Sequence, residues 1–197
     1  MLKIAVLVSG GGTNLQAIID AVDSGKITNA EIVKVISNTA KAYALERAEN
    51  HKIATAVVRK KDWPDNCRWE KALAQEIENS GADLVVLAGF LCVLSADFTS
   101  KFPDRIINVP PSLIPSFCGE GFYGMKVHEA ALAKGVKVTG ATVHFVNEQV
   151  DGGRIIAQKA VRVLPGDTPD VLQKRVMEQA EWVILPQAID DIANNRL

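Results

Sequence analysis

The sequence predicts a single α/β domain over residues 1–197, with a mostly parallel twisted sheet and helices on both faces, a Rossmann-like arrangement. Short β-branched runs alternate with amphipathic helical patterns, which is typical of right-handed strand–helix–strand crossovers. The early runs are apolar on both faces, as expected of strands buried between two helical layers. A chain of 197 residues has room for one well-buried domain, and no linker or repeat divides it.

Apolar runs of strand length recur along the chain. In chain order the predicted strands are 4–8, 31–37, 55–58, 83–90, 105–109, 140–146 and 154–164. The first five are separated by helical patterns or loops, so we expect them to pair in parallel. The last two form a hairpin-like stretch, 140–164, that we expect to complete the sheet.

Two helices are marked by apolar residues at helical spacing. The first presents one apolar face, formed by Leu15, Ile18, Ile19 and Val22. Its start is predicted at Thr13, because Thr13 and Gln16 have the spacing of a capping box. The second helix carries Trp69, Ala72, Leu73, Glu76 and Ile77. We expect it to end near Gly81, since glycine commonly follows the last helical turn.

A long final helix is predicted from its start signal. Thr168 has the side chain of an N-cap, and Pro169 suits the first helical position, where a missing N–H costs nothing. The predicted core face of this helix is Val171, Leu172, Val176 and Ile184.

Composition excludes several classes of function. Lysine and arginine total 22 against 23 acidic residues, so the chain has no basic surface for nucleic acid. No run approaches the ~20 apolar residues of a membrane span. The apolar start of the chain ends in a glycine turn without a cleavage site, so a buried strand is favoured over a signal peptide. We expect a cytoplasmic protein with neither nucleic-acid nor membrane partners.

The cysteines and histidines predict neither a disulfide framework nor a metal site. The cysteines are odd in number and form no CxxC pair: Cys67, Cys92 and Cys118. The histidines fall into no HExxH pattern: His51, His128 and His144.

A glycine-rich turn, residues 9–14, follows the first strand and leads into a helix. Free backbone amides at a helix N-terminus attract an anion, most simply a phosphate. The dinucleotide fingerprint fails, because Leu15 occupies its third glycine position and no ribose-binding acid follows the second strand. The turn therefore favours a phosphomonoester such as a ribose 5-phosphate group. The alternative is a tight turn that needs glycine for its geometry alone.

Polar and turn-forming residues also gather in the second half of the chain. Asn108 lies at the carboxyl end of a predicted strand, and Asp151 lies in a turn after another. With the motifs SGGGTNLQAII, VISN, DLVVLAGF, INVxPSLIPSF, HEAAL, TGATVHFV and VDGGRIIAQ, the chain resembles the folate-dependent glycinamide ribonucleotide formyltransferase family of purine synthesis. The resemblance covers nearly the whole chain.

The resemblance implies two small-molecule substrates and no tightly bound cofactor. For 5-phosphoribosylglycinamide, it implies a phosphate cradle at Gly12, Thr13 and Asn14, and a ribose contact at Glu181. For the co-substrate 10-formyltetrahydrofolate, it implies contacts from Phe90, Leu91, Cys92, Val93, Leu94 and Asn108. The family often has arginine where this chain has Cys92, a change that recognition through the backbone tolerates. The resemblance is compatible with a monomer or a homodimer.

The catalytic trio implied by the resemblance is incomplete. Asn108 and Asp151 match two members, but Pro110 replaces the proton-donor histidine of the third, and proline has no side chain that titrates. Asn108 is expected to stabilise the oxyanion. Loss of a general acid–base slows transfer by ~10²–10⁴-fold, whereas positioning of the two substrates is retained. His144 is a candidate substitute, although we favour a supporting role because the family has this histidine as well.

Three functions stay open on this basis. They are a formyltransferase slowed by Pro110, a catalytically inactive folate- or ribonucleotide-binding homologue, and a 10-formyltetrahydrofolate hydrolase. The phosphate turn disfavours the hydrolase, which has no ribonucleotide to hold. We interpret Cys118 as incidental because no base lies next to it in sequence. The charged groups 59–61 and 190–191 are interpreted as solvated faces.

Overall fold

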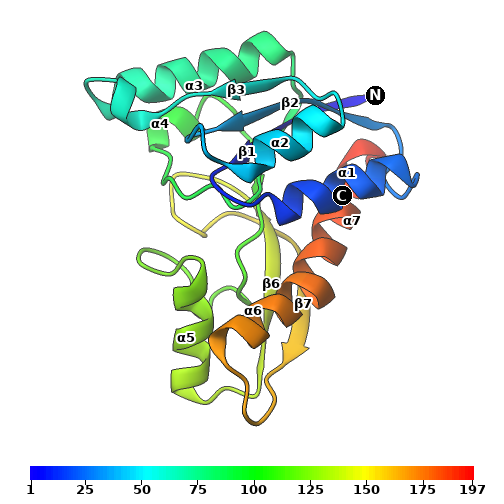
Figure 1. The fold of residues 1–197 in the computed structure, drawn as a ribbon, viewed down its shortest axis with the longest axis vertical. Helices are drawn as coiled ribbons and strands as arrows, with labels where there is room; N and C mark the ends of the chain where they lie inside the picture. Colours follow the sequence, from blue (N-terminus) through cyan, green and yellow to red (C-terminus); the bar gives the residue numbers. More distant parts are fainter.

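The computed structural model describes residues 1–197 as a seven-stranded sheet with helices on both faces (Figure 1). The strand order is β3-β2-β1-β4-β5-β6-β7. The first five strands are parallel: β1 (Leu2–Val8), β2 (Ala30–Ser37), β3 (Thr55–Val57), β4 (Leu84–Leu87) and β5 (Ile106–Asn108). The last two are antiparallel: β6 (Val138–Phe145) and β7 (Ile155–Arg162). The fold class, the strands and the closing hairpin are confirmed.

The strand predicted at 83–90 is shorter than its apolar run. It ends at Leu87, and Gly89 then adopts a φ of 71°, which takes the chain out of the extended region. The apolar residues that follow therefore belong to a loop at the carboxyl edge of the sheet.

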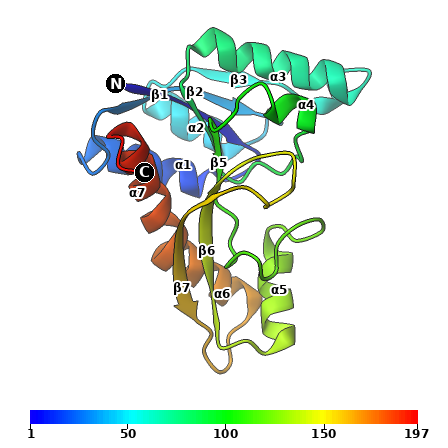
Figure 2. The same cartoon turned by 180° about the vertical axis from the view of Figure 1, so that it is seen from behind.

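Helices cover the sheet unequally. One face carries the larger core cluster under α1 (Thr13–Asp23), α2 (Tyr43–Asn50) and α7 (Trp182–Ala193). The other carries a smaller cluster under α3 (Asn66–Ser80) and α4 (Ala96–Thr99). Two further helices pack together beside the β6–β7 hairpin (Figure 2), α5 (Met125–Lys134) and α6 (Pro169–Val176). None of the helices combines the length and the apolar composition that a membrane span requires.

The predicted helix faces of α1 and α3 are confirmed. Leu15, Ile18 and Ile19 are buried in the larger core. In α3, Trp69, Leu73 and Ile77 are buried in the smaller one, and the helix ends at Gly81, whose φ is 66°.

The final helix begins as predicted but is not continuous. The Thr168 side chain accepts a hydrogen bond from the amide of Val171, and Pro169 is the first helical residue. A π-helical turn, η2 (Met177–Glu181), separates α6 from α7. Leu172, Val176 and Ile184 are buried, but the prediction for Val171 is wrong. Val171 is 48% exposed because Leu172, about 100° further round the helix, faces the core.

The interpretation of 190–191 as a solvated face is also wrong for Asp190. Its Oδ1 accepts hydrogen bonds from the amide and the hydroxyl of Thr28, at 2.7 Å and 2.9 Å, and its carboxylate pairs with Arg196. The Thr28 amide is the main cause that holds the pKa of Asp190 below its usual range. Asp190 thus fastens the end of α7 to the loop before β2. In contrast, Lys60 and Lys61 are exposed, as predicted.

Candidate functional site

The glycine-rich turn leaves the N-terminus of α1 uncapped. Gly12 is the N-cap, with a φ of 71°, and no side chain caps the helix. The predicted capping box is therefore wrong. Gln16 instead donates to Asp20 at 2.8 Å and accepts from Arg47 at 3.0 Å, while the Thr13 hydroxyl lies 3.8 Å from the Met177 sulfur. The first amides of the helix are consequently available to an anion.

Asn14 and Glu181 form a buried pair beside this turn. The Asn14 Nδ2 donates to Glu181 Oε2 at 2.8 Å, across 167 positions of sequence. Burial raises the pKa of Glu181 to about 7, against the opposing effect of the Asn14 hydrogen bond. The Asn14 Oδ1 is buried and accepts no hydrogen bond. An unused buried acceptor suits a ligand hydroxyl, because a hydroxyl can donate to it.

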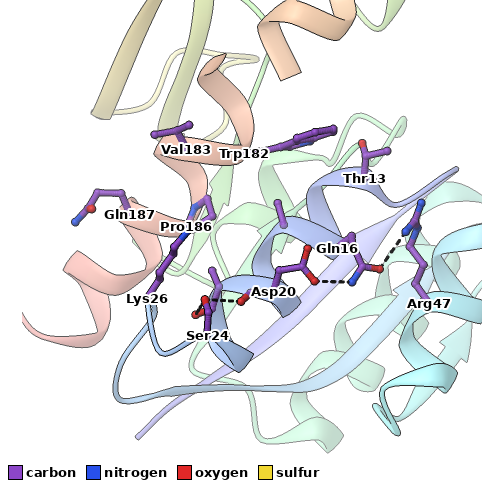
Figure 3. A pocket seen from close by; sticks show the side chains of 12 residues that line it. Thr13, Gln16, Asp20, Ser24, Lys26, Arg47, Trp182, Val183, Pro186 and Gln187 are labelled. Carbon is purple, nitrogen blue, oxygen red and sulfur yellow. Dashed lines mark hydrogen bonds between the residues drawn. The ribbon is translucent and has the colours of Figure 1, made fainter. Parts of the chain in front are cut away.

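A groove adjoins the same turn (Figure 3). It has a volume of about 740 Å³ and runs between α1 and α7. Thr13 and Arg47 line the end nearest the turn, and Trp182 and Pro186 line the α7 side. The groove therefore reaches the glycine-rich turn at its Thr13 end.

The segment Phe90–Leu94 is a loop tethered to the neighbouring strands. The Leu91 amide donates to Ser9 Oγ at 2.8 Å, and the Asn38 Nδ2 donates to Cys92 Sγ at 3.0 Å. Leu91 and Val93 are 64% and 67% exposed. The loop therefore presents apolar side chains to solvent beside the glycine-rich turn, as an apolar ligand would require. Ser9 and Asn38 are tethering residues that sequence reasoning missed.

The ends of this loop are fixed by packing. Leu94 is buried in the smaller core. The Phe90 ring stacks on Trp69, with ring centroids 6.4 Å apart and an interplanar angle of 12°. The exposed middle of the loop is thus held between two anchored ends.

Asn108 and Pro110 lie where β5 runs beside β6. Asn108 pairs with His144 in register, and its side chain makes no hydrogen bond within the chain. The amide of Val146 donates to the Ile106 carbonyl at 2.8 Å, and the amide of Thr142 donates to the Pro110 carbonyl at 3.2 Å. Such antiparallel pairs normally exchange two bonds. Proline lacks the N–H that would complete the second pair.

Thr142 holds the loop that follows Pro110. Its hydroxyl donates to the Ser112 carbonyl at 2.7 Å and accepts from the Ile114 amide at 3.1 Å. The Gln158 side chain also donates to this hydroxyl, at 3.0 Å. Thr142 is fully buried. No sequence signal separated Thr142 from an ordinary strand threonine, so its role emerges only from the structure.

His144 and Asp151 face each other across the β6–β7 hairpin. The His144 Nε2 lies 3.5 Å from Asp151 Oδ1, and both side chains are largely buried. A bulge in β7 shifts the register between Val143 and His144, so that His144 lies opposite Ile155 rather than Ile156. Asp151 has a positive φ of 54° and its Oδ2 accepts from the Gly119 amide at 2.8 Å. Two segments therefore fix this carboxylate.

Asp151 is kept ionised by its neighbours. Burial works to raise its pKa, but the His144 ring and the Gly119 amide outweigh burial and lower it. The His144 Nδ1 lies 2.7 Å from the Phe145 carbonyl, which only accepts, so Nδ1 carries a proton. The Nε2 is then the ring nitrogen that faces Asp151.

Close backbone approach at Gly153 brings these two residues together. A Cβ at this position would lie 1.7 Å from the Phe145 carbonyl oxygen. Any larger residue would push the 150–153 turn away from the end of β6. Glycine at this position is therefore a requirement of the site, which the VDGG motif indicated only as a turn.

Cys118 and His128 lie in environments that do not favour a catalytic role. Burial and the nearby Asp151 carboxylate raise the pKa of the Cys118 thiol, which disfavours the nucleophilic thiolate. His128 is fully buried in α5, and burial lowers its pKa to about 4. Neither of its ring nitrogens makes a hydrogen bond. The interpretation of Cys118 as incidental agrees with this environment.

The chain is similar to known proteins in both sequence and structure. The formyl transferase family pattern matches residues 2–189. A phosphoribosylglycinamide formyltransferase of Haemophilus influenzae is 42% identical over 197 residues, which are 100% of this chain and 90% of that protein. The crystal structure of glycinamide ribonucleotide transformylase 1 from Symbiobacterium toebii has a TM-score of 0.93 at 42% identity, covering 100% of this chain and 90% of that one.

A second solved structure agrees with the first. The phosphoribosylglycinamide formyltransferase of Coxiella burnetii, in complex with CHES, has a TM-score of 0.91 at 40% identity. The alignment covers 100% of this chain and 89% of that one. Both the fold and the full length of the chain are thus shared with these enzymes.

Proposed function

The chain belongs to the formyl transferase family, and from this premise we propose that it transfers a formyl group to the amino group of 5-phosphoribosylglycinamide in purine synthesis. It is a transferase, since full-length relatives at 40% identity or more carry that name. We place one formyltransferase domain over residues 1–197. The family's formyl donors are folate derivatives, and we propose 10-formyltetrahydrofolate as the donor for this chain.

The observation that carries the proposal is the meeting of three segments at one edge of the sheet. The glycine-rich turn follows β1, the Phe90–Leu94 loop follows β4, and Asn108 ends β5. These strands are neighbours, with Leu87 in register with both Leu7 and Asn108. Ligands of parallel α/β sheets bind beyond the carboxyl ends of the strands. Two substrates held at adjacent strand ends would meet over Asn108.

We assign the ribonucleotide to the turn and to the Asn14–Glu181 pair. The amides at Gly12 and Thr13 would hold the phosphate. The free Oδ1 of Asn14 and the Glu181 carboxyl would take the ribose hydroxyls. We assign the pterin ring to the backbone and exposed apolar side chains of Phe90–Leu94, next to Asn108.

At the reacting centre we assign separate roles to Asn108, His144 and Asp151. The amine attacks the formyl carbon, an oxyanion develops, and a proton moves from the attacking to the leaving nitrogen. The unpaired Asn108 amide would donate to the oxyanion. Asp151 would order a water molecule that carries the proton. His144, whose Nε2 lies 3.5 Å from Asp151 Oδ1, would support Asp151. Pro110 contributes no proton, so transfer relies on positioning and oxyanion stabilisation.

A transfer assay tests the proposal. Both substrates are mixed with the purified chain, and formylated ribonucleotide and tetrahydrofolate are measured together. We expect slow formation of both in equal amounts, and less of both with Asp151→Asn. Glu148→Gln, an exposed neighbour on the same hairpin, is the matched control and should leave the rate unchanged.

The remaining functions correspond to other outcomes of the same assay. Tetrahydrofolate released equally fast without the ribonucleotide would indicate a 10-formyltetrahydrofolate hydrolase. Binding of both substrates without any product, even after Pro110→His, would indicate a binding protein. Either outcome would overturn the transferase assignment.

A further inference from the structure

Helix α2 holds the glycine-rich turn from behind. The Ala44 amide donates to the Gly10 carbonyl at 3.1 Å, and the Arg47 Nε donates to the Gly11 carbonyl at 2.8 Å. A Cβ on Gly12 would lie 2.6 Å from the Ala44 Cβ. The first turn of α2 and the glycine-rich turn are therefore in direct contact, with two carbonyls of the turn aimed at α2.

The direction of these carbonyls decides where the amides point. In a planar trans peptide, the carbonyl of one residue and the N–H of the next point in opposite directions. Because the Gly10 and Gly11 carbonyls face α2, the amides of Gly11 and Gly12 face away from it. The Gly12 carbonyl accepts from the Gln16 amide at 2.9 Å, which fixes the next peptide as well. Successive free amides around a left-handed residue form a concave anion site.

Arg47 is itself held in place (Figure 3). Its Nη1 donates to Gln16 Oε1 at 3.0 Å, and Gln16 in turn donates to Asp20 Oδ1 at 2.8 Å. The guanidinium also lies over the Tyr43 ring, 5.0 Å from its centroid. This combination leaves the Arg47 fork little freedom, so the charge stays against the backbone of the turn.

We infer that Arg47 is a positioning residue for the ribonucleotide phosphate, acting through the Gly11 carbonyl. It keeps the Gly11–Gly12 peptide turned so that its N–H faces the anion, and it places a positive charge behind the turn. The inference rests on the proposed function, which assigns the phosphate to this turn. Tyr43 and Gln16 hold the guanidinium in the required orientation.

Calorimetric titration of Arg47→Ala with each substrate separately tests the inference. The dissociation constant for 5-phosphoribosylglycinamide should rise by about 10- to 100-fold. This is the change that corresponds to losing one hydrogen bond made by a charged group. The constant for 10-formyltetrahydrofolate should not change. Arg47→Lys keeps the charge and one donor, so it should restore part of the affinity. Arg68→Ala, which removes an exposed arginine from α3, is the matched control.

The outcomes separate the inference from the function on which it rests. Equal ribonucleotide affinity in the parent and in Arg47→Ala overturns the inference alone. Equal weakening for both substrates shows a general structural role and also overturns it. A parent chain that does not bind the ribonucleotide overturns the proposed function itself. Arg47→Met, which keeps the aliphatic stem, gives the same readouts if Arg47→Ala does not fold.

Discussion

The proposed ribonucleotide end of the site and its proposed reacting centre differ in how many of the expected side chains are present. At the ribonucleotide end, α2 orients the turn and a buried Asn14–Glu181 hydrogen bond is already in place. At the reacting centre, the Asn108 side chain is unpaired and Pro110 stands where a proton carrier is expected. We therefore expect substrate binding and chemistry to be separable in this chain. Substitutions at the two ends should therefore change different measurements.

The largest effect is expected from Pro110→His. The imidazole restores a general acid–base, so kcat should rise by about 10²–10⁴-fold with little change in substrate affinity. The new N–H at position 110 can donate to the Thr142 carbonyl and complete the ladder pair. In the proposed reacting centre the Asp151 carboxylate would favour the protonated ring, so the rate should acquire a pH dependence.

Paired pH–rate profiles under saturating substrates measure this effect. Pro103→His, at an exposed proline, is the control for a histidine added elsewhere. Identical profiles for the parent and Pro110→His would show that the proton travels by another route, with His144 the first residue to substitute.

Asn108→Ala should weaken the reacting centre further, whereas Pro110→His should restore it. Removal of an oxyanion donor typically costs ~10²–10³-fold, and we expect that loss in the residual transfer rate. Ribonucleotide affinity should be unchanged, because Asn108 lies at the other end of the site. Single-turnover rates test this, with Asn50→Ala at the exposed end of α2 as control. An unchanged rate would remove Asn108 from the mechanism.

Glu181→Gln tests the ribonucleotide end through stability. Burial raises the pKa of Glu181 from its ordinary 4.5 to about 7. The group therefore stabilises the fold fully below pH 4.5, and this contribution disappears as the pH rises through about 7. The loss should be about 3 kcal/mol in the free energy of unfolding.

Urea unfolding between pH 5 and pH 8 measures this prediction. The parent should lose stability across the range relative to Glu181→Gln, which has no carboxyl to ionise. Glu49→Gln on α2 changes an exposed carboxyl and should follow the parent. If the free energies of unfolding of the parent and of Glu181→Gln changed with pH in parallel, the raised pKa of Glu181 would be contradicted.

The smallest effect is expected from Gly12→Ala. The methyl group would meet Ala44, and the residue would have to keep a φ of 71°. We expect a loss of about 1–3 kcal/mol in stability, together with weaker ribonucleotide binding. Gly10→Ala is the matched control, because no atom lies within 4 Å of its Cβ position. Thermal unfolding and calorimetry distinguish the two, and equal behaviour would show that the turn adapts to the added methyl group.

Much of the fold follows from local sequence rules. The strand runs, the Leu15 face of α1, the Gly81 stop and the Thr168–Pro169 start depend on neighbours in sequence, and all are confirmed. Two of the failures, the capping box and the solvated face at 190–191, involve distant partners. Gln16 bonds Arg47 rather than capping its own helix, and Asp190 bonds Thr28.

The candidate site divides in the same way. Family motifs indicated Asn108, Asp151 and the glycine-rich turn, but their roles stay predictions. No local pattern indicated Arg47 or Thr142, because each acts on backbone carbonyls brought near by the tertiary fold. A side chain that hydrogen-bonds a backbone group far away in sequence has no fixed sequence distance from that group, so no motif marks it.

The π-helical turn between α6 and α7 makes the proposed ribose contact of Glu181 depend on the number of residues in the turn. Each residue of an α-helix advances the direction of its side chain by about 100°. Deleting one residue from Met177–Glu181 would allow an unbroken α-helix, and the residues after the deletion would rotate relative to α6. Either Glu181 would leave Asn14, or Ile184 and Leu185 would leave the core. We therefore expect a one-residue deletion in this five-residue segment to disrupt the site or the core, even where side chains other than Glu181 are replaceable.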